Sequence, residues 1–328
     1  MILVQENVVL ACGTMKYKNK DNDNIPNIYY NPYPVRDLVN KINKDQSVAI
    51  IGARLSAIDT VIGLIENGHM GEISMISRSG HFPRVRGKQG RYNCKHLNAD
   101  TIIKLAQDSV DGITLADLAR VFFMELNEFR LTHDDQPENL SFPPEPIDDL
   151  GDFLTQEIKL ADKDRGWQAI LYHTNSMLGL VWDLMSPQER ERFYRQYFSA
   201  AISMRVSIPA ENAEKILKFY QSGQLKFLVG NFSMDKEPMT ERHVLRSEHS
   251  EITVDNIVWA TGSPREMEAS DSDFIKNILG SGYVRRHPFG GIDTSLGHNV
   301  ICHTGKELPK MGCFDLKNGL SSLLLKLF

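Results

Sequence analysis

One short stretch constrains the fold of this chain more than any other: the apolar run Val48–Ile51, which ends at Gly52 and leads directly into a helical pattern. Buried parallel strands are short continuous apolar runs of this kind. A helix is expected over 56–67, because apolar side chains recur there at helical spacing: Ile58, Val61, Ile62 and Ile65. A second apolar segment follows at 72–77. Strand, glycine turn, helix and strand within about 30 residues predict the βαβ unit of a dinucleotide-binding fold.

The glycine turn departs from the usual dinucleotide-binding pattern G-x-G-x-x-G/A at one position. Gly52 and Ala57 match its first and last positions, but Arg54 stands where the central glycine is expected. That glycine lets the backbone approach a pyrophosphate, which the N–H groups and dipole of the helix N-terminus hold. Two interpretations are open: Arg54 pairs with a phosphate, or it obstructs the site. The candidate binding turn comprises Gly52, Arg54, Leu55, Ser56 and Ala57.

The composition is that of an ordinary globular chain and argues against several classes of function. The 328 residues, 41% hydrophobic and 24% charged, suffice for two domains or for one domain with an insertion. A net charge of −5 argues against nucleic-acid binding as the main task. No apolar run approaches membrane-spanning length, and the first residues do not resemble a signal peptide. Four scattered cysteines without metal-ligand spacing are typical of reduced thiols, so we expect a cytoplasmic protein without a metal site.

Two further segments, 7–13 and 255–262, each have the pattern of a strand that ends in a glycine. Between them lie the βαβ unit and a helix-rich region over about 99–220. The expected helices in that region span 100–107, 114–130, 168–184, 187–201 and 211–222. The expected strands that follow span 226–230, 243–247 and 251–260. The two glycine-ended strands suggest that one domain is interrupted by another.

Local signals support the boundaries of three segments in the helix-rich region. Thr114 and Asp117 form a capping pattern at the start of one helix. Pro187 suits the first turn of another. The segment 132–152 is polar and contains four prolines, at 137, 143, 144 and 146, so we expect an exposed connection there.

Several motifs resemble one known family. Residues 11–13 (Ala-Cys-Gly) and 260–262 (Ala-Thr-Gly) are similar to the paired Ala-Thr-Gly strands of flavoproteins with two dinucleotide domains. The segments 51–59, 76–84, 167–192 and 205–230 resemble bacterial FAD/NAD(P)-binding oxidoreductases related to flavin-containing and N-hydroxylating monooxygenases. The resemblance covers most of the chain. It implies an α/β fold in which a Rossmann-like NAD(P)-binding domain with a helical insertion joins a partial FAD-type α/β domain. The implied activity is that of an NADP(H)-linked oxidoreductase or monooxygenase acting on a small molecule.

The resemblance also implies a division of the chain. Residues 1–45 would be a remnant of the FAD-type domain, 46–250 the NAD(P)-type domain with its insertion, and 251–328 the return to the FAD-type domain. In the family a strand and glycine turn hold the FAD pyrophosphate, and no such unit precedes residue 7. The remaining candidate flavin contacts are Gly13, Gly262 and the segment 312–319.

This incomplete flavin site leads to two expectations and one alternative. We expect no stoichiometric FAD in the chain purified alone, although the family binds FAD. We also expect a homodimer, or a partner subunit that completes the flavin domain. The alternative is a non-catalytic accessory or nucleotide-binding subunit that retains the fold.

The carboxyl end of the second strand distinguishes NAD from NADP. An acidic residue there hydrogen-bonds the ribose 2′-hydroxyl, whereas an arginine accommodates a 2′-phosphate. This chain has Ser77 and Arg78 with no acid, and further basic residues follow: Arg84, Arg86, Lys88 and Arg91. We therefore expect NADP(H), with Ser77, Arg78 and Arg84 among the residues that bind it. A solvated basic loop would have the same composition.

No catalytic residue is assigned from the sequence. Three histidines titrate near neutrality but have no neighbouring nucleophile or metal pattern: His81, His96 and His173. Asp59 is expected to be a structural helix residue, and Cys12 a small buried one. The three tryptophans are expected in the core: Trp167, Trp182 and Trp259. In the resembling family, cofactors carry the reaction and the protein orients them.

Overall fold

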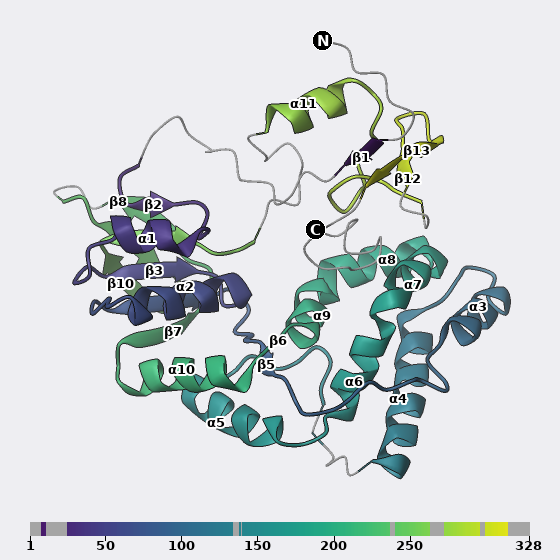
Figure 1. Ribbon diagram of the computed structural model, residues 1–328, viewed down its shortest axis with the longest axis horizontal. Coiled ribbons are helices and arrows are strands. Elements are labelled where there is room, and N and C mark those ends of the chain that lie inside the picture. Colours follow the sequence, from purple (N-terminus) through teal and green to yellow (C-terminus); the bar gives the residue numbers. More distant parts are fainter. Residues whose placement is uncertain are drawn as a thin grey trace.

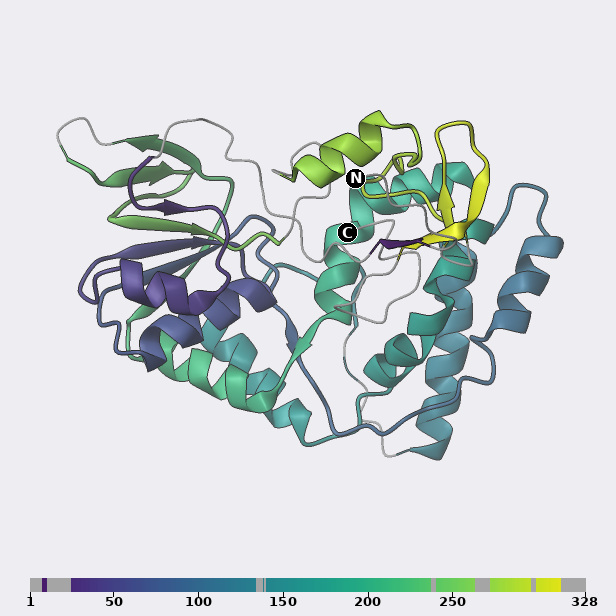
Figure 2. The same cartoon turned by 45° about the horizontal axis from the view of Figure 1, so that its top comes forward.

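The computed structural model describes residues 8–10, 25–133, 138, 140–236, 240–262, 272–295 and 299–313. Figures 1 and 2 show three parts: a sheet covered by helices, a helical unit beside it, and a small β region with helix α11 (Asp273–Gly280) next to the helical unit. No helix among these described residues is both long and apolar enough to cross a membrane.

The central sheet consists of five parallel strands in the order β2-β11-β3-β4-β7. Their bounds are Ile28–Tyr29 for β2, Val48–Ile51 for β3, Ile73–Ser77 for β4, Leu225–Val229 for β7 and Asn256–Trp259 for β11. From β3 the chain proceeds through β4 to β7 on one side, and then crosses to β11 on the other. The strand order therefore reverses between β3 and β11, and ligands bind at such switch points. The predicted α/β fold with a Rossmann-like sheet is confirmed.

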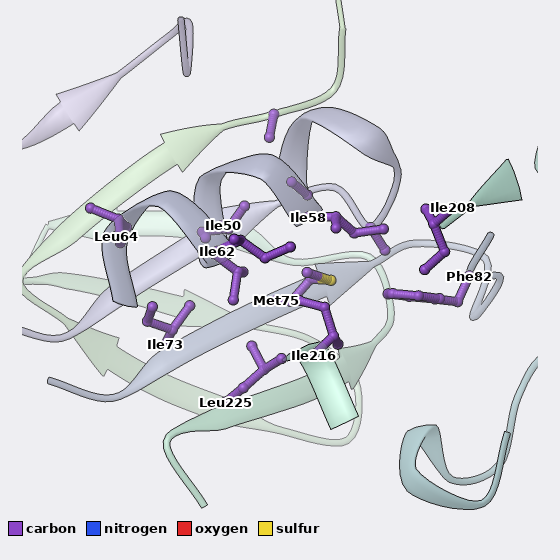
Figure 3. Packing of buried hydrophobic residues seen from close by; sticks show 14 of the residues in the cluster. Ile50, Ile58, Ile62, Leu64, Ile73, Met75, Phe82, Ile208, Ile216 and Leu225 are labelled. Atoms are coloured by element: carbon purple, nitrogen blue, oxygen red, sulfur yellow. The ribbon is translucent and has the colours of Figure 1, made fainter. Parts of the chain in front are cut away.

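Side-chain alternation along the strands divides the core of this part into two layers. Val48 and Ile50 face a layer of helices: α1 (Val35–Lys41), α2 (Leu55–Glu66), α5 (Leu150–Ala161) and α10 (Ala210–Gln221). Figure 3 shows this layer, in which Ile50, Ile58, Met75 and Ile216 belong to one buried cluster. Ala49 and Ile51 face the opposite layer, an antiparallel sheet of β8 (Ser233–Lys236), β9 (His243–Arg246) and β10 (Glu251–Val254). Burial on both faces is why the strand is apolar at every position.

The helical unit comprises α3 (Ala99–Gln107), α4 (Leu115–Thr132), α6 (Gly166–His173), α7 (Leu178–Leu184), α8 (Pro187–Arg192) and α9 (Phe198–Arg205). A 3-10 turn, η1 (Thr174–Met177), precedes α7, and a π-helical turn, η2 (Phe193–Tyr197), precedes α9. Thr114 and Asp117 form the predicted capping box of α4, and Pro187 occupies the first turn of α8. Trp167 and Trp182 are buried in the core, as expected.

A short parallel pair, β5 (Arg84–Val85) with β6 (Ser207–Ile208), lies where the helical unit meets the sheet (Figure 1). Helix α5 was not predicted; it begins at Leu150, within the expected connection 132–152. Its N-cap, Asp149, accepts a hydrogen bond from the backbone N–H of Asp152 at 2.8 Å. The residues before this helix are polar and rich in proline, and for that reason the sequence predicted a connection where the helix begins.

The sheet topology differs from the predicted division of the chain. Strand β2 and helix α1, expected within the remnant 1–45, belong to the central sheet and its helical layer. The expected strand 251–260 is two strands in two sheets: β10 pairs with β9, and β11 with β3. The boundaries drawn at 45 and 250 therefore do not coincide with the sheets. An apolar strand does not specify its partner in sequence, because pairing uses the backbone.

The first glycine-ended segment lies apart from the central sheet. Its described part, β1 (Val8–Leu10), pairs in parallel with β13 (Glu307–Cys313), which also pairs with β12 (Asn299–Ile301). The two glycine-ended segments thus contribute strands to different sheets. Gly13, Cys12 and the part of the segment 312–319 beyond Cys313 lie outside the described residues.

Candidate nucleotide-binding cleft

A large open cleft of about 1830 Å³ lies at the carboxyl edge of the central sheet. The ends of four strands contribute to one side of it through Gly52, Ser77, Gly230 and Thr261. The other side is formed by residues of the helical unit, chiefly from α6, η2 and α9. Seven predicted site residues line the cleft: Gly52, Arg54, Leu55, Ser56, Ser77, Arg78 and Gly262. Ala57 is fully buried behind the turn.

The turn after β3 admits only glycine at position 52. Gly52 has φ +125°, and a Cβ there would lie 2.6 Å from the carbonyl oxygen of Ala260 and 3.0 Å from its carbon. The N–H of Gly52 donates to the carbonyl of Ile76, and the N–H of Ala260 donates to that of Ile51, both at 2.9 Å. The ends of β3, β4 and β11 are therefore tied together at the switch point. Because no side chain separates them, the backbone itself forms the floor of the cleft there.

The N-terminus of α2 opens beside this turn without a capping side chain. Arg54 is the N-cap residue, its side chain makes no capping hydrogen bond, and the first turn contains no acid. The first intrahelical bond is donated by the N–H of Ile58 to the carbonyl of Arg54. The N–H groups of Leu55, Ser56 and Ala57 thus precede the helical ladder, and they carry the positive end of the helix dipole. This arrangement fits the pyrophosphate of a dinucleotide.

The side chain of Arg54 extends toward the helical unit. Its Nη2 donates to both the carbonyl oxygen and the Oγ of Ser199 in α9, each at 2.8 Å. Both acceptors are neutral, and an anionic phosphate is the stronger acceptor for a guanidinium. Through this contact the side chain of Arg54 spans the cleft from α2 to α9. Both interpretations from the sequence, that Arg54 pairs with a phosphate and that it obstructs the site, stay predictions.

The basic cluster predicted after β4 is divided by the fold. Ser77 is buried and its Oγ donates to the carbonyl of His81 at 3.2 Å, whereas Arg78 is exposed and makes no ion pair among the described residues. Arg84 does not line the cleft, contrary to its predicted site role. Its Nη1 pairs with Glu157 Oε1 at 2.8 Å, because strand β5 turns this side chain toward α5. Lys88 likewise pairs with Asp162. Arg86 and Arg91 remain in the cleft.

A buried ionic network at Glu157 explains the position of Arg84. Glu157 is 1% exposed and accepts from Arg165 Nη1 at 2.7 Å, from Arg84 and from the N–H of Val85. Burial alone favours the neutral acid, but the hydrogen bonds and charges of Arg165 and Arg84 outweigh it and lower the pKa of Glu157. Arg84 is therefore part of the support between β5 and α5.

The charge of the cleft is opposite to that of the chain. Among the described residues that line it, six are arginines and one is a carboxylate, Asp59, although the chain carries a net charge of −5. The arginines are Arg54, Arg78, Arg86, Arg91, Arg195 and Arg205. Asp59 projects from α2 and accepts a hydrogen bond from the hydroxyl of Tyr33 at 2.7 Å. A concave surface with this imbalance concentrates anions.

The remaining predicted residues divide between cleft and surface. His81 and His173 line the cleft, and Nε2 of His81 lies 2.9 Å from the carbonyl of Pro144. His96 lies outside the cleft, with its Nε2 3.9 Å from Oε2 of Glu128. Trp259, predicted in the core, packs partly buried against the layer between the two sheets and also lines the cleft, where it stacks on Tyr30 with ring centres 6.5 Å apart. No group of three or more potential metal ligands occurs among the described residues.

Several cleft residues carry no signal in the sequence, and four of them are Tyr172, Ser199, Arg205 and Ser207. All four come from the helical unit or the strand that follows it, and they reach the cleft only through the packing of that unit against the sheet. No motif or spacing relates them to the glycine turn, more than a hundred residues away in sequence.

Comparison with models of protein families finds no match, and comparison with curated proteins finds none. Among solved structures, the chain is similar to ornithine N-hydroxylase of Kutzneria sp. 744 with reduced FAD, NADP+ and L-ornithine. The identity is 13%, the TM-score 0.44, and the match covers 98% of this chain and 60% of that one. L-lysine 6-monooxygenase from Pseudomonas syringae matches at 14% identity and a TM-score of 0.47, and the match covers 97% of this chain and 57% of that one. The protein OTEMO with FAD and NADP matches at 12% identity and a TM-score of 0.39, and the match covers 94% of this chain and 55% of that one.

The chain thus spans between 55% and 60% of the length of these three structures. Two of them are hydroxylases or monooxygenases that act on amino acids, the class that the sequence motifs resemble. Identities of 14% or less and TM-scores below 0.5 carry no argument about activity. The nucleotide part of the function proposed for this chain therefore rests on its own cleft.

Proposed function

We propose that this chain binds NADP(H) in the cleft and belongs to an NADP(H)-linked, flavin-type oxidoreductase or monooxygenase that acts on a small molecule. One observation carries the nucleotide part: the uncapped N-terminus of α2 and the exposed Arg78 after β4 line the same cleft. The first suits a pyrophosphate, and the second suits the 2′-phosphate that distinguishes NADP from NAD. The flavin part rests on the sequence resemblance.

The residues of the cleft fit the nucleotide by shape as well as by charge. Gly52 leaves the backbone bare where a pyrophosphate would approach, and Ser77 with Arg78 replaces the acid that an NAD ribose requires. NADPH, when bound, supplies a hydride, and this chain would bind and orient it. FAD is expected from the sequence resemblance, and of its candidate contacts Gly262 lines the cleft, whereas Gly13 lies outside the described residues.

Calorimetric titration with NADP+ and NAD+ tests the proposal. The wild-type chain is expected to bind NADP+ more tightly. Arg78→Ala should weaken NADP+ binding by about 1–3 kcal/mol, the value of a charge-assisted hydrogen bond, and leave NAD+ binding unchanged. Arg120→Ala is the matched control, since it removes an equal charge from α4, outside the cleft. Equal affinity of the wild-type chain for both nucleotides would refute the choice of NADP(H).

Two further expectations from the sequence stay predictions: a cytoplasmic location, and a homodimer or partner subunit. Sedimentation of the purified chain tests the second. Nucleotide binding without any substrate-linked oxidation of NADPH, in the presence of added FAD, would favour the alternative of a non-catalytic nucleotide-binding subunit.

A further inference from the structure

Arg205, the last residue of α9, brings a positive charge to the helical side of the cleft without a carboxylate partner among the described residues. Its Nη1 donates to the carbonyl of Leu171 and to Oδ1 of Asn175, and its Nη2 donates to Oγ1 of Thr174, all at 2.9 Å. All three acceptors are neutral. A guanidinium has five N–H donors, so the Nε–H and one Nη2 hydrogen remain, and no described residue accepts from them.

This charge is costly where it lies. Burial lowers the pKa of Arg205 to about 10, and no acidic group opposes that effect. The carbonyls at the C-terminus of α6, among them the bonded carbonyl of Leu171, supply only a partial negative charge, roughly half an elementary charge. The three bonds to neutral acceptors hold the guanidinium in place, but they do not neutralise it. A cation that is held rigid and left uncompensated beside a cleft is suited to an anion that arrives from the cleft.

Further donors line the same cleft as Arg205. The hydroxyl of Tyr172, the residue after Leu171, lies 2.7 Å from Oγ of Ser207. Nε of Arg86 donates to that same Oγ at 3.3 Å, and its Cζ lies 6.0 Å from the centre of the Tyr172 ring. Arg205 is linked to this group through the chain: its Nη1 bonds the carbonyl of Leu171, the neighbour of Tyr172, and Ser207 follows Arg205 by two positions. Together with Asn175, all of them line the cleft.

We propose that these five residues, the helical-side cluster of Arg86, Tyr172, Asn175, Arg205 and Ser207, form a second anion-binding site, separate from the N-terminus of α2. Arg205 supplies a fixed charge, and the more exposed Arg86 turns its guanidinium onto the ligand. The hydroxyls of Tyr172 and Ser207 are hydrogen-bonded to each other, so one of their two hydrogens is left to donate to the ligand. Guanidinium groups with hydroxyls select a planar or tetrahedral oxyanion, so the ligand group is a carboxylate or a phosphate.

This oxyanion has two possible sources: a phosphate of the dinucleotide itself, or a separate acidic ligand that shares the cleft. Only the first source depends on the proposed function. The second source would place an anionic substrate or effector against the helical unit, opposite the nucleotide-binding turn.

Inorganic phosphate is the probe for the cluster, with binding measured by calorimetry at constant ionic strength. Arg86→Gln is the main variant, because Arg86 is exposed and its loss leaves the core intact. Arg205→Lys keeps a charge but loses the planar donor geometry. Each is expected to weaken phosphate binding about tenfold or more. Lys88→Gln, which removes an exposed cation outside the cleft, is the control and should bind as the wild type. Thermal unfolding checks that every variant is folded.

Titrations with NADP+ and NAD+ then identify the source. Weaker nucleotide binding by Arg205→Lys and Arg86→Gln assigns the oxyanion to the dinucleotide. Unchanged nucleotide binding together with lost phosphate binding assigns it to a separate ligand. A wild-type chain that binds phosphate through the cluster but does not bind NADP+ refutes the proposed function and supports the second site. If the folded variants Arg86→Gln and Arg205→Lys bind phosphate and both nucleotides like the wild type, the second site is overturned. This outcome does not depend on the result for Arg78→Ala.

Discussion

Replacing Gly52 by alanine tests the geometry at the switch point. At φ +125° a side chain is strained, which costs about 1–2 kcal/mol for an L-residue. The new Cβ would also lie 2.6 Å from the carbonyl oxygen of Ala260, and relieving such overpacking in a rigid site costs about 1–3 kcal/mol. The backbone of Ala260 cannot move freely, because its N–H is bonded to Ile51. We therefore expect Gly52→Ala to lower the free energy of unfolding by about 2–5 kcal/mol.

Gly223→Ala provides the matched control for this substitution. Gly223 also has a positive φ, +79°, but a Cβ there would meet no atom within 4 Å. Its cost should be the conformational one alone, about 1–2 kcal/mol. Urea unfolding of both variants isolates the contact with Ala260 as the difference between them. Calorimetry should also show NADP+ binding weakened by Gly52→Ala and unchanged by Gly223→Ala. Equal destabilisation by the two substitutions would refute the close approach of β3 and β11.

Two other predictions concern Arg54 and Glu157. Arg54→Gly should weaken NADP+ binding about tenfold and flatten its salt dependence, because a charged donor is removed; tighter binding would instead identify Arg54 as an obstruction. Ser199→Ala, which removes only one neutral acceptor of Arg54, should leave NADP+ affinity nearly unchanged. Glu157 has a pKa below its unfolded value, so its stabilisation is complete above that value and is lost as the pH falls through the folded pKa. Glu157→Gln should therefore lower the free energy of unfolding by about 3–5 kcal/mol at pH 7 and by less in acid. Urea unfolding measures both values, and an equal loss of stability at pH 7 and pH 3 would contradict this reasoning.

The positions of charged residues show most clearly what sequence analysis could and could not provide. Arg78 and Arg84 are six residues apart and were predicted to share a role, yet one is exposed in the cleft and the other pairs with Glu157. The direction of a side chain on a short strand depends on the element packed against it. That element, α5, is more than 60 residues away in sequence, and its start was not predicted because prolines precede it.

The sequence alone determined the βαβ unit. The continuous apolar run of β3, the glycine after it and the helical period of α2 are local signals, and local backbone and burial preferences are enough to interpret them. They also indicated the turn that lines the cleft. Capping at Thr114 and Pro187 is local in the same sense, and both helix starts were predicted for that reason.

Only the tertiary structure decided which strands pair and which residues complete the cleft. Strand β11 joins β3 from more than 200 residues away, and Arg205 reaches the cleft because the helical unit packs beside the sheet. Backbone hydrogen bonds between strands carry no residue code, so an apolar strand is compatible with more than one neighbour. The positive charge of the cleft likewise arises from arginines scattered over about 150 positions, whose proximity is a property of packing and not of any local pattern.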